Sequence, residues 1–430
     1  MSTTLTEIAL KAKANPKMQF TSLAHLLTPG YLKDNWRELN KAAVKGIDGE
    51  TIKEFGDKLD SRIEDIVSRL KSGSYKAPLI QRVDIPKGNG KTRPLGITTV
   101  EDRLVQRSVA GILGAIFEQD FLETSHGYRP GKGPHDALRS LRSQIVAGKV
   151  RHVYEADIRG YFTSISHEWV RKMVRQRIAD KTILRLIDKW LRVGVVFNGE
   201  VTQPESGTPQ GGPISCILAN LYLHYVLDLW FEKVFKRSCQ GEVYITRFVD
   251  DFVCCFQDWE EMARFDKELT ERMKKFNLEL APEKTRMLQF GKFARINLAR
   301  KNLKPETFTF LGFEHICGLD KNGKFALIRI PSKKSCRKFL DRTKEWLKRH
   351  IHWRRVDQRV QLSIMLIGFY RYFGLNHCKP KLDNIHFEVK RQWRNAIKRQ
   401  SQRHVVYWSY LRSKSWFSLP YANACFNPTV

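Results

Sequence analysis

The sequence predicts an α+β protein, in which helices and strands alternate irregularly and a purely helical region follows. Residues 52–73 and 100–118 carry apolar side chains every three or four positions, the spacing of an amphipathic helix. Residues 79–97 and 244–256 contain short apolar runs interrupted by turn-forming residues, which is typical of strand hairpins. Strands separated by pairs of helices indicate an α+β core.

We expect the elements in the following order. The first 78 residues are mainly helical, and Gly73 ends the helix that begins near Ile52. A hairpin follows, with strands at 79–87 and 91–97 joined by a Gly-Asn-Gly turn. The later elements are a helix at 100–118, a strand and turn at 152–162, helices to about 193, a strand hairpin at 244–256 and a helix at 259–276.

After Pro331 the sequence becomes helical and strongly basic. Residues 331–403 contain 20 Lys or Arg against 5 Asp or Glu, which is half of the excess positive charge of the chain. Three helices are predicted there, at 332–351, 356–373 and 382–400. We therefore divide the chain into a helical extension (1–78), an α+β core (79–315), a helical appendage (316–400) and a short basic and aromatic tail (401–430).

The composition indicates a polyanionic partner. The 430 residues include 75 Lys or Arg and 45 Asp or Glu, a net charge of +30. The longest apolar run, 109–117, is too short to span a membrane, and the N-terminus lacks a signal-peptide pattern, so we expect no membrane partner. Eight scattered cysteines form no CxxC pair, so we expect reduced cytosolic thiols with no zinc site and no disulfide.

Two adjacent aspartates, Asp250 and Asp251, interrupt an apolar stretch (YITRFVDDFVCCF) that resumes at once. Neighbouring carboxylates repel each other, and burying them unpaired is costly. One explanation is a solvent-exposed turn, where Asp is common. The other is a tight hairpin that presents both carboxylates to a divalent cation, whose charge removes the repulsion.

Asp157 is the candidate for a third carboxylate, because it ends the apolar strand VYEAD. A strand-end Asp is more often a cap or turn residue, so Asp157 alone indicates little. Together with Asp250 and Asp251 it completes the set that two-metal phosphoryl transfer requires. Mg²⁺ prefers oxygen ligands of this kind and commonly bridges carboxylates to a phosphate. We expect two Mg²⁺ ions, for which Mn²⁺ could substitute.

Six blocks occur in a fixed order: IPKGNGKTRPLGI, SHGYRPGKG, ADIRGYF, GTPQGGPISCILANLYLH, RFVDDF and FTFLGF. In this order they resemble the blocks of reverse transcriptases, and most closely those of the bacterial group II intron-encoded reverse transcriptase/maturase family. The similarity runs from about residue 30 nearly to the end. It implies a right-hand polymerase, with fingers and palm to about residue 315 and then a helical thumb, called domain X in maturases. It also implies a bacterial cytoplasmic protein.

The resemblance implies a role for each acidic residue. Asp157 and Asp250 match the metal-binding carboxylates, and Asp251 matches the second aspartate of the catalytic box. The resemblance also implies that Ile158, next to Asp157, contacts the metal and the nucleotide. Phe162 matches an aromatic gate that excludes the nucleotide 2′-hydroxyl. The alternatives are that Phe162 is a core aromatic or that Tyr161 is the gate.

The resemblance also implies contacts to the incoming dNTP. Lys87, Lys91 and Arg93 match a hairpin that closes over the triphosphate, where cations neutralise developing charge. A solvated hairpin would carry similar lysines, so Arg93 and Lys87 are favoured over Lys91. Gln210, in the glycine-rich block, matches a residue near the nucleotide.

The sequence departs from the family pattern in three places. The usual Tyr-Ala-Asp-Asp box is Phe-Val-Asp-Asp here, and we expect Val249 to alter fidelity or nucleotide tolerance. Pro213 and Cys216 stand in a block that more often reads GVISPLLAN. The chain shows no HNH endonuclease pattern before Val430, so we expect no target-strand cleavage by this polypeptide.

The basic appendage is expected to contact RNA or DNA phosphates without reading bases. Its predicted partners are a structured RNA (an intron or a dedicated non-coding RNA) and an RNA template with a DNA primer, while the oligomeric state is left open. The candidate contacts are Arg129, Lys333, Lys334, Arg337, Lys348, Arg349, Arg391 and Arg394.

Three functions remain open. The first is a group II intron-type reverse transcriptase that also assists splicing. The second is an RNA-binding splicing cofactor with no polymerase activity, although none of the three carboxylates has been lost. The third is a domesticated reverse transcriptase in antiphage defence or beside a CRISPR system. The flanking DNA separates the first from the third, because only an intron protein lies within catalytic intron RNA.

Overall fold

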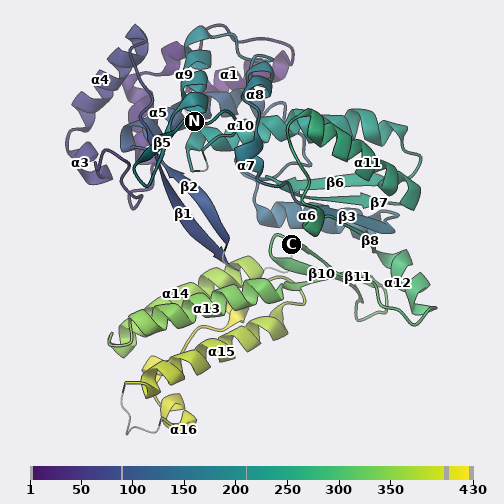
Figure 1. Cartoon of the computed structure of the whole chain (residues 1–430). Helices are drawn as coiled ribbons and strands as arrows, with labels where there is room; N and C mark the ends of the chain where they lie inside the picture. Colours follow the sequence, from purple (N-terminus) through teal and green to yellow (C-terminus); the bar gives the residue numbers. More distant parts are fainter. Residues whose placement is uncertain (1–2, 89–90, 210, 401–405, 426–430) are drawn as a thin grey trace.

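The structure is a computed structural model that describes all residues except 1–2, 89–90, 210, 401–405 and 426–430. Figure 1 shows a helical layer with a projecting hairpin, a central sheet flanked by helices, and a separate helical bundle. This mixture of helices and largely antiparallel sheets confirms the predicted α+β class.

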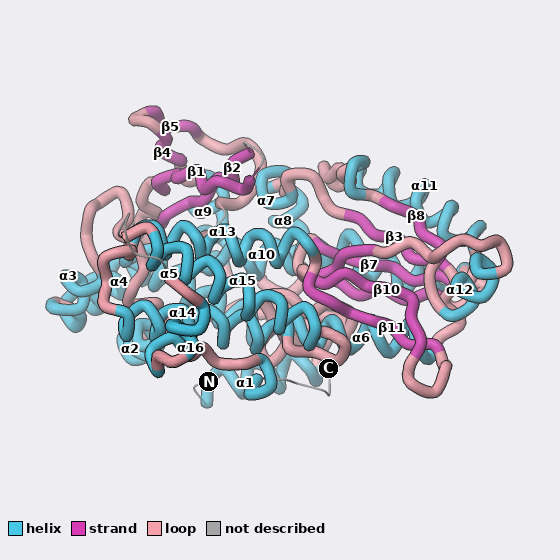
Figure 2. Tube along the Cα trace, turned by 90° about the horizontal axis from the view of Figure 1, so that it is seen from below, coloured by secondary structure: helices cyan, strands magenta, loops and turns pink. Residues whose placement is uncertain are grey.

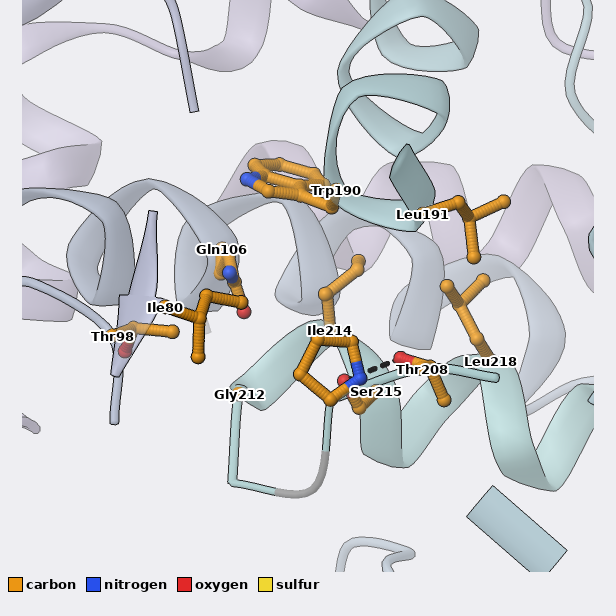
Figure 3. Close-up of a pocket in the computed structure, with 11 residues that line it drawn as sticks. Ile80, Thr98, Gln106, Trp190, Leu191, Thr208, Gly212, Ile214, Ser215 and Leu218 are labelled. Atoms are coloured by element: carbon orange, nitrogen blue, oxygen red, sulfur yellow. Dashed lines mark hydrogen bonds between the residues drawn. The ribbon is translucent and has the colours of Figure 1, made fainter. Parts of the chain in front are cut away.

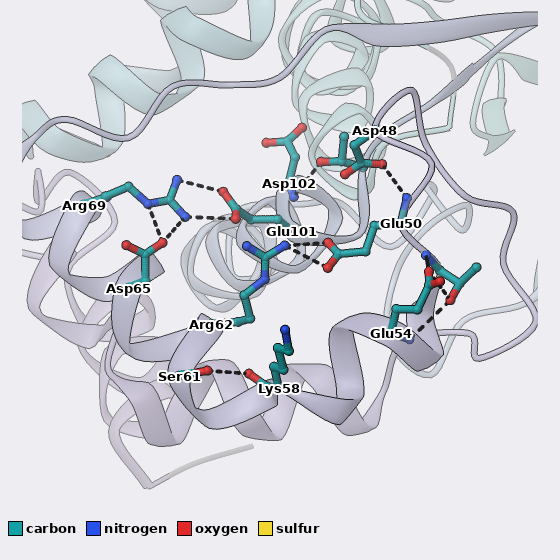
Figure 4. Close-up of polar contacts among 12 residues, drawn as sticks. Asp48, Glu50, Glu54, Lys58, Ser61, Arg62, Asp65, Arg69, Glu101 and Asp102 are labelled. Carbon is teal, nitrogen blue, oxygen red and sulfur yellow. Dashed lines mark hydrogen bonds and ion pairs between the residues drawn. The ribbon is translucent and has the colours of Figure 1, made fainter.

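The N-terminal layer is helical, as predicted. Its helices are α1 (Thr3–Ala14), α2 (Pro29–Arg37), α3 (Ile52–Asp57) and α4 (Leu59–Ser72), which pack against one another and α5 (Val100–Phe117). Arg62 and Arg69 of α4 pair with Glu50 and Glu101 at 2.7 and 2.9 Å (Figure 4). These ion pairs fix α4 against the preceding loop and the start of α5.

The single helix expected at 52–73 is broken between α3 and α4. The break follows Gly56, whose missing side chain leaves room for the Trp36 ring, since an added Cβ would lie 3.2 Å from it. Glycine also weakens a helix interior. The predicted stop at Gly73 is confirmed, because this residue adopts the left-handed conformation (φ 76°) at the end of α4.

The predicted hairpin of 79–97 is confirmed. Strands β1 (Ile80–Gly88) and β2 (Lys91–Ile97) pair antiparallel, and β1 also pairs in parallel with β4 (Val195–Phe197), which pairs with β5 (Glu200–Thr202). The β1–β2 hairpin projects from the helical layer towards the bundle (Figure 1).

The central sheet has the strand order β6-β7-β3-β8 and is antiparallel. Its strands are β3 (His152–Ala156), β6 (Val243–Phe248), β7 (Asp251–Phe256) and β8 (Arg286–Gln289). Helices α6 (Pro134–Ala147) and α11 (Trp259–Lys275) cover its two faces. Neighbouring residues of a strand point to opposite faces, so Cys254 belongs to the core under α11 and Cys255 to the core under α6. Both cysteines are ordinary buried strand residues.

The helices predicted up to about residue 193 are confirmed as α7 (Tyr161–Ser164), α8 (His167–Val174) and α9 (Lys181–Arg192). Helix α10 (Pro213–Leu223) continues into two π-helical turns, His224–Asp228 and Phe231–Phe235. Within the described residues this stretch, Pro213–Ser238, is long and apolar enough to cross a membrane. The length of the longest uninterrupted apolar run, 109–117, did not indicate it. However, 78% of its most apolar window is buried inside the fold, as in a core helix.

A third sheet connects the core to the bundle. It has the order β11-β10-β9, with β9 (Phe308–Phe310), β10 (Phe313–Leu319) and β11 (Phe325–Pro331), and α12 (Lys292–Ala299) precedes it. The three predicted helices are confirmed as α13 (Lys333–Arg349), α14 (Arg355–Phe373) and α15 (Lys379–Lys398), and α16 (Trp408–Arg412) follows. The proposed boundary between residues 315 and 316 falls inside β10, so the helical part begins only at Lys333. Figure 2 shows the bundle helices α13, α14 and α15 beside the strands β10 and β11.

Candidate active site

Strands β6 and β7 are joined by only two residues, Val249 and Asp250, because Phe248 pairs directly with Asp251. Asp250 therefore lies at the tip of a tight hairpin, and Asp251 begins β7. Strand β3 pairs with β7 up to Ala156 opposite Phe252, so Asp157 leaves the sheet at the same end. The structure thus brings together the three carboxylates selected from the sequence, and Asp157 and Asp251 are close enough to share a hydrogen bond.

A cation that no local sequence pattern indicates also belongs to this cluster. Lys284, in the turn before β8, forms an ion pair with the Asp157 carboxylate. The strand register explains this position. Glu155 of β3 pairs with Arg286 of β8, and the strands are antiparallel, so Asp157, two residues after Glu155, lies beside Lys284, two residues before Arg286. Lys284 could be assigned to the cluster only by knowing that β8 pairs with β3, and the local sequence does not specify this pairing.

The cluster is electrostatically strained. Removal from water and repulsion by Asp250 and Asp157 raise the pKa of Asp251 to about 7, although part of the residue remains exposed to solvent. Removal from water also raises the pKa of Asp250, and repulsion by Asp157 adds to the effect. Lys284 opposes both increases. One carboxyl of the group therefore readily carries a proton near neutral pH.

The donor set fits a hard divalent cation, since three carboxylates converge on a site that already attracts an ammonium group and a proton. A ready-made coordination cage is not present: among the residues that the structure describes, no group of three His, Cys, Asp or Glu has the arrangement of a metal site. Lys284 would have to move aside from Asp157 as a cation entered.

The hairpin turn is supported from beneath by a buried ion pair. Arg247 and Asp228 are both fully buried and form two hydrogen bonds of 2.8 and 2.6 Å. Arg247 also donates to the Val249 carbonyl oxygen (2.9 Å) and to the side chain of Asn220 (3.1 Å). Asp228 comes from the first π-helical turn after α10. Removing one partner of such a pair typically costs ~3–5 kcal/mol, because the other charge stays buried.

Val249 itself has an unfavourable backbone. Its φ is 61°, a conformation that is rare for a β-branched residue. Its side chain is buried against Gly127, where an added Cβ would lie 2.6 Å from the Val249 nitrogen. Gly127 is fixed in turn by Asn220, whose side-chain amide donates to its carbonyl oxygen at 2.5 Å. Val249 thus packs into the protein, and the expected effect on fidelity stays a prediction.

Arg93 and Tyr128 lie next to the carboxylates. Arg93 of β2 is exposed, and its charge offsets part of the rise in the pKa of Asp250 that burial causes, so it lies near the carboxylates; its contact to the nucleotide stays a prediction. Tyr128 is 51% exposed, and removal from water raises its pKa to about 12, with smaller contributions from Cys216 and Asp250. The side chains of Lys87 and Lys91, and the whole of Gln210, lie outside the described residues.

The aromatic candidates are buried in this conformation. Phe162 is 4% exposed and packs edge-on against Tyr161, with ring centroids 5.4 Å apart. The Tyr161 hydroxyl donates to the Ala219 carbonyl oxygen at 2.5 Å. Ile158 is also buried and forms a β-bridge with Leu280. The gate role of Phe162 therefore stays a prediction.

A small pocket is lined in part by Thr208, Pro209 and Gly212 of the glycine-rich block (Figure 3). Gln106 and Trp190 line it, and both donate hydrogen bonds of 2.8 Å to the buried Asp102. Burial raises the pKa of Asp102 to about 6. The residues that line the pocket support this block, and the pocket itself is too small for a nucleotide.

One predicted nucleic-acid contact is wrong. Arg129 is 7% exposed, pairs with Glu118 at 2.7 Å and donates to the carbonyl oxygens of Leu122 and Ser125, so its guanidinium group is fully engaged inside the protein. Arg394 is half-buried, donates to the Val406 carbonyl oxygen (2.9 Å) and lies over the Trp408 ring. Its contact to nucleic acid stays a prediction.

The other basic candidates of the bundle are on its surface. Lys333, Lys334, Arg337 and Lys348 of α13 are exposed. Arg349 and Arg391 are also exposed, and each pairs with a glutamate of its own helix, at 2.5 and 2.6 Å. Exposed pairs within one helix are weak, so these two side chains can exchange partners.

The chain resembles several known proteins. A family model described as reverse transcriptase (RNA-dependent DNA polymerase) matches residues 85–315. The group II intron-encoded protein LtrA of Lactococcus lactis subsp. cremoris is 33% identical over 289 residues, which cover 66% of this chain and 45% of LtrA. Protein YkfC of Escherichia coli (strain K12) is 34% identical over 225 residues, which cover 51% of this chain and 59% of YkfC. The chain spans less than two thirds of the length of either relative.

Gly127→Ala should displace the turn of the β6–β7 hairpin. The new Cβ meets the backbone of Val249, which cannot rotate away, so we expect a loss of about 1–3 kcal/mol of stability. Thermal unfolding would measure it. Gly114→Ala is the matched control, because a Cβ there meets no atom within 4 Å. An equal melting temperature for both variants would contradict the close packing of Gly127 on Val249.

Asp251→Asn should stabilise the cation-free protein at neutral and alkaline pH. The raised pKa means that the folded state retains a proton which the unfolded state releases, so wild-type stability falls as pH rises from about 4 to 7 and is then constant. The side chain is exposed, so we expect a gain of only about 1 kcal/mol at pH 8, fading towards pH 4. Thermal unfolding across this pH range, with the exposed Asp341→Asn as control, would measure it. A pH-independent difference would show that repulsion is not the cause.

Proposed function

Since the chain belongs to the reverse transcriptase family, and within it to the group II intron-encoded reverse transcriptases and maturases, we propose that it is an RNA-directed DNA polymerase. The observation that supports this activity is the convergence of Asp157, Asp250 and Asp251 at one end of the central sheet. The substrates would be dNTPs, a DNA primer and an RNA template.

The three aspartates would hold two Mg²⁺ ions, with the Ile158 carbonyl oxygen as a further ligand. When bound, the ions lower the pKa of the primer 3′-hydroxyl and neutralise charge on the leaving pyrophosphate. Arg93, together with Lys87, would bind the triphosphate, because its guanidinium group already lies near Asp250. Lys284 would hold the carboxylates together in the absence of the cation.

In this proposal the chain is organised as a right hand. The central sheet with α6 and α11 would be the palm, the β1–β2 hairpin with its helical layer the fingers, and α13–α15 the thumb. Two contacts support this arrangement: Arg93 of the hairpin is close enough to Asp250 to offset part of the rise in its pKa, and burial together with the Asp251 charge raises the pKa of Tyr372 of α14.

We further propose that the protein binds structured RNA and assists intron splicing, as a cytoplasmic protein. The exposed cations of α13, with Lys333, Lys334 and Arg337 in its first turns, would contact phosphates. LtrA carries the description of a group II intron-encoded protein, which favours intron RNA as the partner here.

Asp250→Asn should lower the rate of dNTP incorporation on an RNA template with Mg²⁺ by on the order of 10²–10³-fold or more. Asp341→Asn, on the exposed surface of α13, should leave the rate unchanged. Extension of a labelled primer would measure both rates. Equal incorporation by the two variants would refute the proposed activity.

Cation binding should release a proton from the carboxylate group. Mn²⁺ affinity, measured by electron paramagnetic resonance, should fall about tenfold for each pH unit below 7, because Asp251 must ionise first. In Asp251→Asn this pH dependence should disappear between pH 6 and 7. An affinity of the wild type that does not change between pH 6 and 8 would argue against a shared proton at this site.

A further inference from the structure

A basic surface lies outside the elements used so far. Residues 291–305 contain five cations, Lys292, Arg295, Arg300, Lys301 and Lys304, and no Asp or Glu. They occupy α12 and the turn after it. We call these five residues the α12 patch.

The cations of the α12 patch are not neutralised within the fold. Across the described part of the chain, none of the five forms an ion pair with a carboxylate. Arg300, Lys301 and Lys304 are exposed. Lys292 lies near Glu242, whose pKa is lowered mainly by hydrogen bonds from the Lys149 amide and the Tyr244 hydroxyl and to a smaller extent by Lys292. Like charges held together without counter-ions repel each other, so an external polyanion would stabilise this segment.

The backbone under the patch is ordered. Helix α12 ends with Asn302 in the left-handed conformation (φ 54°), and the Leu303 amide donates back to the Leu298 carbonyl oxygen at 2.9 Å. The start of α12 is anchored by the Gly291 amide, which donates to the Cys317 sulfur at 3.2 Å. Arg300, Lys301 and Lys304 therefore project from a fixed turn.

The α12 patch lies far from the three carboxylates. Strand β8, which leads into α12, runs antiparallel to β3, so Gln289 lies beside His152 while Asp157 is at the other end of β3. Five strand residues separate these ends, or about 16 Å at ~3.3 Å per residue. Figures 1 and 2 both show α12 at the edge of the molecule, away from the fingers-side helices α3 and α4.

We propose that the α12 patch binds the sugar–phosphate backbone of a double-helical RNA segment outside the polymerase cleft. This inference rests on the proposed RNA-binding function and adds a second contact surface to it. The patch offers several fixed cations to a rigid polyanion, which suits backbone contacts without base recognition. An anionic membrane fits less well, because α12 has only 8 residues, and the exposed large apolar side chains there are only Ile296 and Leu303 among those described.

The test uses the full chain and a 24-base-pair RNA duplex as probe. In the variant R300Q/K301Q/K304Q we expect duplex affinity at 100 mM KCl to fall about tenfold or more. The slope of log affinity against log salt should become shallower by roughly 2–3 if all three cations contact phosphates, since each lost contact removes somewhat less than one unit. The control K267Q/K274Q/K275Q has the same net charge and alters exposed lysines of α11, the helix on the face of the central sheet opposite α6.

Two further measurements separate the outcomes. Extension of a short primer–template should stay within twofold in the patch variant, because the patch is remote from the carboxylates. Equal duplex binding and salt slope for patch variant and control would overturn the inference while leaving the polymerase proposal intact. Loss of binding to phosphatidylserine vesicles with unchanged duplex binding would overturn it in favour of a membrane contact. If the patch variant binds the duplex more weakly and the wild-type chain does not polymerise, the result would support the patch and contradict the polymerase proposal.

Discussion

The buried ion pair between Arg247 and Asp228 is the interaction on which the active-site geometry depends. It lies directly under the two-residue connection of β6 and β7 and holds the Val249 carbonyl oxygen. A β-branched residue with φ of 61° persists only where its surroundings enforce that conformation. Asp228 is itself positioned by a π-helical turn, so the irregularity of the helix after α10 serves the hairpin.

The supported hairpin allows two carboxylates to stand side by side at a strand end. Their mutual repulsion, with that of Asp157, is offset only in part by Lys284. A site of this kind is less stable than its neutral equivalent, and such local strain is expected where function requires concentrated charge. The exposed Asp251 and the engaged Asp157 show that the cluster lies at the protein surface, where an incoming cation can reach it.

Local patterns predicted most elements correctly, including the β1–β2 hairpin, α5, α11 and the three bundle helices. The three carboxylates were identified because acidic residues that interrupt or end an apolar strand are visible in two short segments, 153–157 and 244–256. Lys284, Asp228 and Asn220 were missed, since each acts across a strand pairing or a helix packing that brings distant segments together. Arg129 was misassigned for the same reason: its sequence block suggested a ligand contact, whereas its partner Glu118 lies in the turn after α5.

The central sheet separates two apolar cores, and this arrangement has a mechanical consequence. Val153 and Val253 on the α6 face belong to the same core as Leu362 of α14 and Trp393 of α15. The bundle is therefore joined to the strands that end in the carboxylates by one continuous core, which also includes Phe308 and Phe313 of the third sheet. A rigid rotation of α13–α15 would have to shear this shared core, so bending is confined to the segments around it, and force applied to the bundle is transmitted to β3 and β7.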